Sequence, residues 1–108
     1  PLAREIETQV GLVGIVHADS PVRDWSRLAW SLRLWRAARD RAMWSRDRLQ
    51  DENASGVAGL RPLVVGHTPV DDPVVLGNVH HIDTGGWMPN GRFTLLDLAT
   101  LQAIPPIS

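Results

Sequence analysis

The chain has 108 residues, a formal net charge of −1, 44% hydrophobic residues and 21% charged residues. This length suits one small domain, and the composition is that of an ordinary globular protein. The near-neutral charge gives no bulk attraction to nucleic acid or to an acidic membrane surface. No apolar run is long enough to span a membrane, and the lack of cysteine excludes disulfides and thiolate metal sites.

The first half of the chain predicts one short strand and one buried strand. A short strand is expected around Ile6 and Thr8. Residues 10–17 read VGLVGIVH, a continuous apolar run bounded by the turn-like sequence ADSP. A run of this length and composition is typical of a strand that is buried on both faces.

A long helix is expected next, over residues 25–49, because neither glycine nor proline interrupts this stretch. Asp24 or Ser26 is expected to cap its start. The face of the helix that packs against the core is expected to hold residues at helical spacing, namely Trp25, Leu28, Leu32 and Trp35. Arginines fill the positions between them, and the polar residues 50–59 are expected to form a loop.

The second half predicts several short strands. Residues 60–67 read LRPLVVGH, a second apolar run that ends in a tight turn. Residues 74–76 and 79–82 flank a Gly-Asn connection of the hairpin type. Residues 92–98 predict the last strand, and residues 99–108 are expected to form a tail outside the core. Strand, helix and then hairpin-linked strands together indicate an α/β fold with a mixed sheet.

Two segments share one design, in which a buried apolar strand ends in a histidine and then a tight turn. They read GIVH-ADSP, with His17, and VVGH-TP, with His67. Side chains at the carboxyl ends of sheet strands are held rigidly and face the crevice where open α/β sheets bind ligands. A neutral imidazole is the commonest protein ligand for metals. These features alone leave two roles open for each histidine, a metal ligand or a hydrogen-bonded polar residue.

Five segments in order resemble a known family. VVGHTPV, NVHHIDTGGW and GRFTLLDL, preceded by GIVHADSP and MWSRDRL, are similar to the C-terminal half of the calcineurin-like metallophosphoesterases. The nearest likeness is to the bacterial and phage type of serine/threonine protein phosphatase. The resemblance covers residues 10–98. It implies an α/β fold that is the C-terminal half of a metallophosphoesterase two-sheet sandwich with flanking helices, so that residues 1–108 form a single partial domain.

The resemblance also assigns site residues. The metal-binding histidines in the family's C-terminal half correspond to His17 and His67, and its arginine for the substrate phosphate corresponds to Arg46. The family uses two divalent metal ions, with manganese expected here and iron or zinc as alternatives. An arginine suits the phosphate role, because its planar guanidinium pairs with two phosphate oxygens and stays charged. The residues alone do not distinguish Arg46 from Arg41 or Arg48.

Other polar residues in the same half receive different expectations. His80 and His81 occupy adjacent strand positions, so their side chains are expected to face opposite ways and cannot share one site. Asp83 is expected to buttress a turn or to orient His67. The arginines among the tryptophans are expected to form a solvated helix face, and no nucleic-acid partner is expected.

The family's N-terminal motifs, GD-x-H-G, GD-x-x-D-R-G and GNH-E/D, do not occur in this chain. Those motifs carry the family's catalytic acid and most of its metal ligands, so no catalytic residue is assigned here. Two histidines cannot hold two ions, because a catalytic metal typically needs about three protein ligands. The chain begins with Pro1 rather than methionine. We therefore expect a fragment of a cytoplasmic enzyme that is inactive by itself.

The expected substrate of the parent enzyme is a phosphorylated protein or a small phosphoester, with no membrane partner. One alternative is a dinucleoside tetraphosphate hydrolase of the same superfamily. A second alternative, from another functional class, is a non-catalytic interaction module that retains half of the fold and has no need of His17 and His67.

Overall fold

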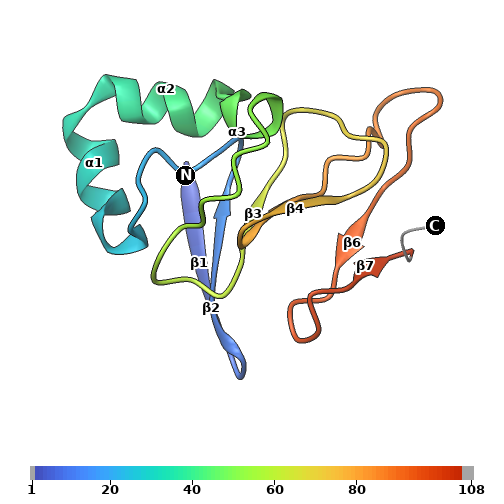
Figure 1. The fold of residues 1–108 in the computed structure, drawn as a ribbon, viewed down its shortest axis with the longest axis horizontal. Helices are drawn as coiled ribbons and strands as arrows, with labels where there is room; N and C mark the ends of the chain where they lie inside the picture. Colours follow the sequence, from blue (N-terminus) through green and yellow to red (C-terminus); the bar gives the residue numbers. More distant parts are fainter. Residues whose placement is uncertain (1, 106–108) are drawn as a thin grey trace.

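The computed structural model describes residues 2–105 and has at its centre a five-stranded mixed sheet (Figure 1). The order across the sheet is β1-β2-β3-β5-β4. The strands span Ala3–Thr8 (β1), Gly11–Val16 (β2), Leu63–Val65 (β3), Val74–Leu76 (β4) and Val79–His81 (β5). With helices packed against the sheet, this arrangement confirms the predicted α/β class.

The three central strands run parallel to one another, and the two edge strands are antiparallel to their neighbours. Gly14 on β2 pairs with Leu63 on β3, and Leu63 pairs with Val79 on β5. Parallel strands in register bring their carboxyl ends to the same edge of a sheet, so the segments that follow β2, β3 and β5 meet there. The hairpin that was predicted between β4 and β5 is confirmed.

The single long helix predicted over residues 25–49 is wrong. The segment forms instead a 3-10 turn and three short helices: η1 (Trp25–Arg27), α1 (Leu28–Leu34), α2 (Arg36–Trp44) and α3 (Asp47–Gln50). The backbone is extended at Trp35 and again at Ser45, which interrupts the helix twice. Asp24 caps the start as predicted, since its carboxylate accepts a hydrogen bond from the Ser26 amide. Within residues 2–105, no helix has the length and apolar character to cross a membrane.

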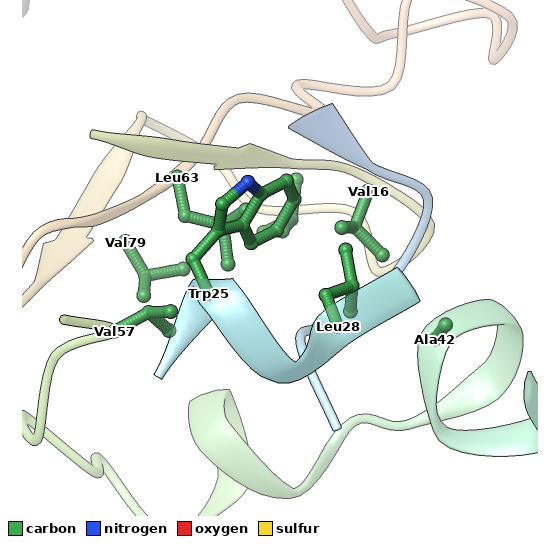
Figure 2. Close-up of a cluster of buried hydrophobic side chains, with 8 residues drawn as sticks. Val16, Trp25, Leu28, Ala42, Val57, Leu63 and Val79 are labelled. Carbon is green, nitrogen blue, oxygen red and sulfur yellow. The ribbon is translucent and has the colours of Figure 1, made fainter. Parts of the chain in front are cut away.

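The core lies between the sheet and these helices (Figure 2). Trp25, Leu28 and Ala42 from the helical segment pack against Val16, Leu63 and Val79 on the strands, with Val57 and Val65 in the same cluster. Each buried aliphatic or aromatic side chain of this kind contributes about 1.5–3 kcal/mol to folding. This cluster fixes the helical segment over the sheet, next to the strand ends that bear the predicted site.

The C-terminal segment forms a separate two-stranded sheet of β6 (Leu95–Leu96) and β7 (Ala103–Ile104), on the far side of the main sheet from α1 and α2 (Figure 1). The strand predicted over 92–98 is therefore reduced to two residues. The predicted tail, 99–108, contributes β7 and lies outside the main sheet as far as Pro105, while its last three residues lie outside the described part of the chain.

Candidate functional site

The site lies at the edge of the sheet where the three parallel strands end. His17 follows β2 directly, His67 follows β3 after one glycine, and Asp83 follows β5 after one isoleucine. The Gly66 amide donates a hydrogen bond of 2.9 Å to the His17 carbonyl oxygen, and the Val70 amide donates one of 2.8 Å to the Asp83 carbonyl oxygen. These backbone bonds hold the three strand ends together and fix the distance between the polar residues that they carry.

The two histidine side chains converge. His17 Nε2 lies 3.2 Å from His67 Nδ1, and the ring centroids are 5.0 Å apart. Two imidazole nitrogens bound to one ion at about 2.1 Å, with an angle between 90° and 110°, would be separated by about 3.0–3.4 Å. The observed separation therefore fits two ligands of a single metal ion.

His67 is held in an unusual backbone conformation beside an aromatic wall. Its φ of 70° lies in the left-handed region, which costs a non-glycine residue about 1 kcal/mol or more. The Trp44 ring meets the His67 ring edge to face, with centroids 5.5 Å apart. Burial lowers the pKa of His67, and the charges of His17 and Arg46 lower it further, against a smaller opposing effect of Asp83. These effects favour the neutral imidazole, which is the form that binds metal.

The three arginines that the sequence could not rank have different surroundings. Arg41 forms an exposed ion pair with Asp47 at 3.8 Å, and Arg48 forms a buried ion pair with Asp19 at 2.9 Å. Arg46 takes part in neither pair, is exposed, and lies near enough to His67 to lower its pKa. Of the three, Arg46 is thus the one whose charge acts on His67 and whose side chain remains accessible to an anion.

Asp83 acts on the turn that follows it. Its carboxylate accepts a hydrogen bond of 3.1 Å from the Gly85 amide, which is the turn-buttressing role expected from the sequence. His17, Gly66 and Asp83 also line an open hollow of about 470 Å³, together with apolar residues that include Ile15 and Val64. The hollow gives the strand ends a concave surface beside the histidine pair.

His80 and His81 stand apart from the site. Their strand partners are Val64 and Val65, which are adjacent residues of β3 and so point to opposite faces of the sheet. His81 is 3% exposed, and both of its ring nitrogens are without a hydrogen-bond partner in the described part of the chain. Burial lowers its pKa to about 4. Neither histidine joins His17 and His67.

Two features of the site escaped sequence reasoning. The sequence pattern gives Trp44 no role at the site, yet it is 60% exposed and its ring contacts the His67 ring. The sequence pattern also gives Asp19 no role, and its buried partner Arg48 was expected to belong to a solvated helix face. One sequence signal precedes this ion pair. Asp19 lies two residues after His17 in HAD, and Arg48 lies two residues after Arg46 in RDR.

A complete metal site is absent from residues 2–105, where no group of three or more histidine, cysteine, aspartate or glutamate side chains is arranged to hold an ion. The described residues therefore fit two ligands of an ion and not its whole coordination shell.

Comparison with known proteins gives a similarity that bears on this site. No family model matches the chain. The chain is 34% identical over 83 residues to serine/threonine-protein phosphatase 1 of Salmonella typhimurium strain LT2, a match that covers 75% of this chain. It covers 34% of the relative, so the chain spans about a third of that protein's length. The similarity relates this chain, at a coarse level, to a phosphatase.

Proposed function

We propose that this chain forms part of a metal-dependent serine/threonine protein phosphatase of the calcineurin-like type, and that it supplies two metal ligands and one phosphate-binding residue. The observation that carries the proposal is the 3.2 Å approach of His17 Nε2 to His67 Nδ1 at neighbouring strand ends. The accessible guanidinium of Arg46 beside this pair, and the similarity to a protein named as a serine/threonine phosphatase, support it.

His17 and His67 would hold one divalent ion, for which manganese is our choice among ions that accept imidazole. When bound, such an ion supplies Lewis-acid polarisation of a phosphate oxygen and activation of a water molecule for attack. The remaining ligands of this ion, and the ligands of a second ion, would be residues beyond the described part of this chain.

The residues of the chain itself bind and orient. Arg46 pairs its guanidinium with two oxygens of the substrate phosphate and so fixes the phosphorus relative to the histidine pair. The surroundings of His67 lower its pKa and so favour its neutral, metal-binding form. Trp44 forms an exposed wall next to His67. Backbone bonds from Gly66 and Val70 keep the three strand ends in register.

Hydrolysis of p-nitrophenyl phosphate and of a phosphoserine peptide, in the presence of manganese, tests this proposal. The two proteins compared are the 108-residue chain and the product of the open reading frame that contains it. We expect turnover only by a longer product, abolished by EDTA and reduced at least about a hundredfold by His67→Ala. Turnover by the chain alone would contradict its assignment as a part of the site. A longer product that hydrolyses neither substrate would favour a non-catalytic interaction module, which has no need of His17 and His67.

A further inference from the structure

A buried ion pair joins the two segments that carry the site. Arg48 Nε donates a hydrogen bond of 2.9 Å to Asp19 Oδ1, and the side chains are only 9% and 4% exposed. Asp19 lies two residues after His17, in the turn that follows β2. Arg48 lies two residues after Arg46, in α3. The pair thus connects the histidine-bearing turn directly to the segment that presents the arginine.

Further hydrogen bonds at both ends lock this connection. Asp19 Oδ1 also accepts a hydrogen bond of 2.8 Å from the Ser20 amide, and Arg48 Nη1 donates to the Ser55 carbonyl oxygen. In the same turn, the Ala18 amide donates to the Ala42 carbonyl oxygen at 2.8 Å. A guanidinium and a carboxylate held this way have one relative orientation, which a flexible surface pair does not have.

The element that carries Arg48 cannot hold its own position. α3 has four residues, far below the length at which a helix is stable in isolation, and its start has only a long side-chain hydrogen bond, of 3.4 Å from the Asp47 amide to the Ser45 hydroxyl oxygen. Its one buried residue is Arg48. Arg46 is the residue that immediately precedes the helix, so its backbone position depends on where Arg48 anchors α3.

A buried ion pair is also a poor choice for stability alone. The cost of removing two charges from water offsets most of their attraction, and apolar replacements of similar size are often neutral or stabilising. What such a pair does provide is a fixed geometry. We propose that Asp19 and Arg48 are positioning residues that set the Arg46 guanidinium against the His17–His67 pair, an inference that rests on the proposed phosphate-binding role of Arg46.

The chain offers a matched control for this proposal. Arg41 and Asp47 form an ion pair of the same chemistry in the same segment, but both side chains are more than half exposed. Asp19→Leu/Arg48→Met replaces the buried ion pair by apolar side chains of similar size. Arg41→Gln/Asp47→Asn removes the exposed ion pair. Asp19→Asn is the conservative variant, because it keeps an oxygen that can accept from Arg48 Nε.

Two spectroscopic measurements on the chain test the role. The 19F signal of 5-fluorotryptophan at position 44, assigned with Trp44→Phe, reports the contact between this segment and His67. Titration with inorganic phosphate, followed at the Arg46 Nε–H signal, gives the affinity for the anion. We expect Asp19→Leu/Arg48→Met to shift the Trp44 signal in the folded state and to raise the phosphate Kd at least about tenfold. The control pair should change neither, and Asp19→Asn should restore most of both.

An unchanged Trp44 signal and an unchanged Kd in folded Asp19→Leu/Arg48→Met would overturn the positioning role. If that variant does not fold, Asp19→Asn and Arg48→Lys decide: the role predicts a shifted Trp44 signal with Arg48→Lys and a near-native one with Asp19→Asn, and the same signal in both would overturn it. If the unaltered chain binds no phosphate, the phosphate-binding role of Arg46 fails, and the Trp44 signal still decides whether the ion pair positions the segment.

Discussion

His17 and His67 show how a residue acquires a role from its place in the fold. Each is an ordinary histidine in sequence, and the two are fifty positions apart. Pairing of β2 with β3 brings their strand ends together, and the left-handed backbone at His67 turns its ring toward His17. Sequence pattern predicted both positions because each follows an apolar run. The pattern could not predict the contact between the rings, because that depends on strand register and on one strained φ angle.

The surroundings of Arg46 and Asp19 could not be predicted from the local sequence. Family resemblance selected Arg46, whereas spacing alone did not separate it from its neighbours. The structure separates them by burial and partner, since Arg48 is enclosed with Asp19 and Arg46 is exposed near His67. Burial of one arginine among many is set by how helices pack on the sheet, which local sequence does not encode.

Protonation of His81 should control acid stability. In the folded chain its pKa is lowered to about 4 from the ordinary 6.5, chiefly by burial. As pH falls below 6.5, the unfolded chain binds a proton at this imidazole and the folded chain does not. The free energy of unfolding is therefore highest above pH 6.5 and should decline by about 3 kcal/mol as pH falls to 4.

Urea unfolding between pH 7 and pH 4 measures this decline. His81→Leu should flatten most of it. The control variant His80→Leu lies on the opposite face of the same strand, and its imidazole also has a pKa lowered by burial, so it should remove only a minor part. A pH dependence that is the same in His81→Leu and in the unaltered chain would refute the assignment.

At the scale of elements, the strands were predicted better than the helices. The apolar runs around β2 and β3 are bounded by turn sequences, so their positions follow from composition. The break at Trp35, between α1 and α2, coincides instead with side-chain contacts between these two short helices and their junction. Arg39 Nη1 donates a hydrogen bond of 3.0 Å to the Leu32 carbonyl oxygen, near the end of α1, and the Trp35 ring packs edge to face on Trp30. Neither contact has a signature in helical periodicity.

Contacts with side chains from other elements also determine which glycine of the sheet cannot be replaced. A Cβ at Gly14, in the middle of β2, would lie 2.6 Å from Leu60 Cδ1 and 2.9 Å from the Trp25 ring. Gly14→Ala should therefore displace the core tryptophan and destabilise the fold by about 1–3 kcal/mol. A Cβ at Gly66 would make only ordinary contacts, 3.7 Å from Asp83 Cβ and from the His17 carbonyl oxygen.

Gly66→Ala is thus the matched control for Gly14→Ala, and it should change stability by less than about 0.5 kcal/mol. Midpoints of urea unfolding at pH 7 give both values. Equal losses of stability in the two variants would show that contact with Trp25 is not the reason for glycine at position 14. The result bears on the site as well, because Gly66 immediately precedes His67.

The whole molecule divides its charge unevenly. Eight of the eleven arginines but only three of the twelve acidic residues lie within residues 23–48, which form the helical segment and its flanks. The rest of the chain is therefore acidic, although the net charge is near zero. This distribution is not visible in the overall composition, and it makes the arginine-rich helical side of the molecule repel a second copy of itself. Residues 86–105 hold only one arginine and one aspartate, so like-charge repulsion does not oppose contact through the C-terminal segment.

Exposed apolar side chains on the C-terminal segment should therefore govern self-association. Trp87, Phe93 and Leu95 are 73%, 79% and 66% exposed, and β6 and β7 have only two residues each, too few to be stable as an independent sheet. Exposed apolar side chains on one segment promote contact between copies. Sedimentation velocity over a tenfold concentration range should show a rising average mass for the chain, and Trp87→Ser/Phe93→Ser/Leu95→Ser should reduce this rise. Trp30→Ser/Trp35→Ser, on the arginine-rich side, should not reduce it. A reduction by the second variant and not by the first would place the contact on the helices instead, against the repulsion expected from their charge.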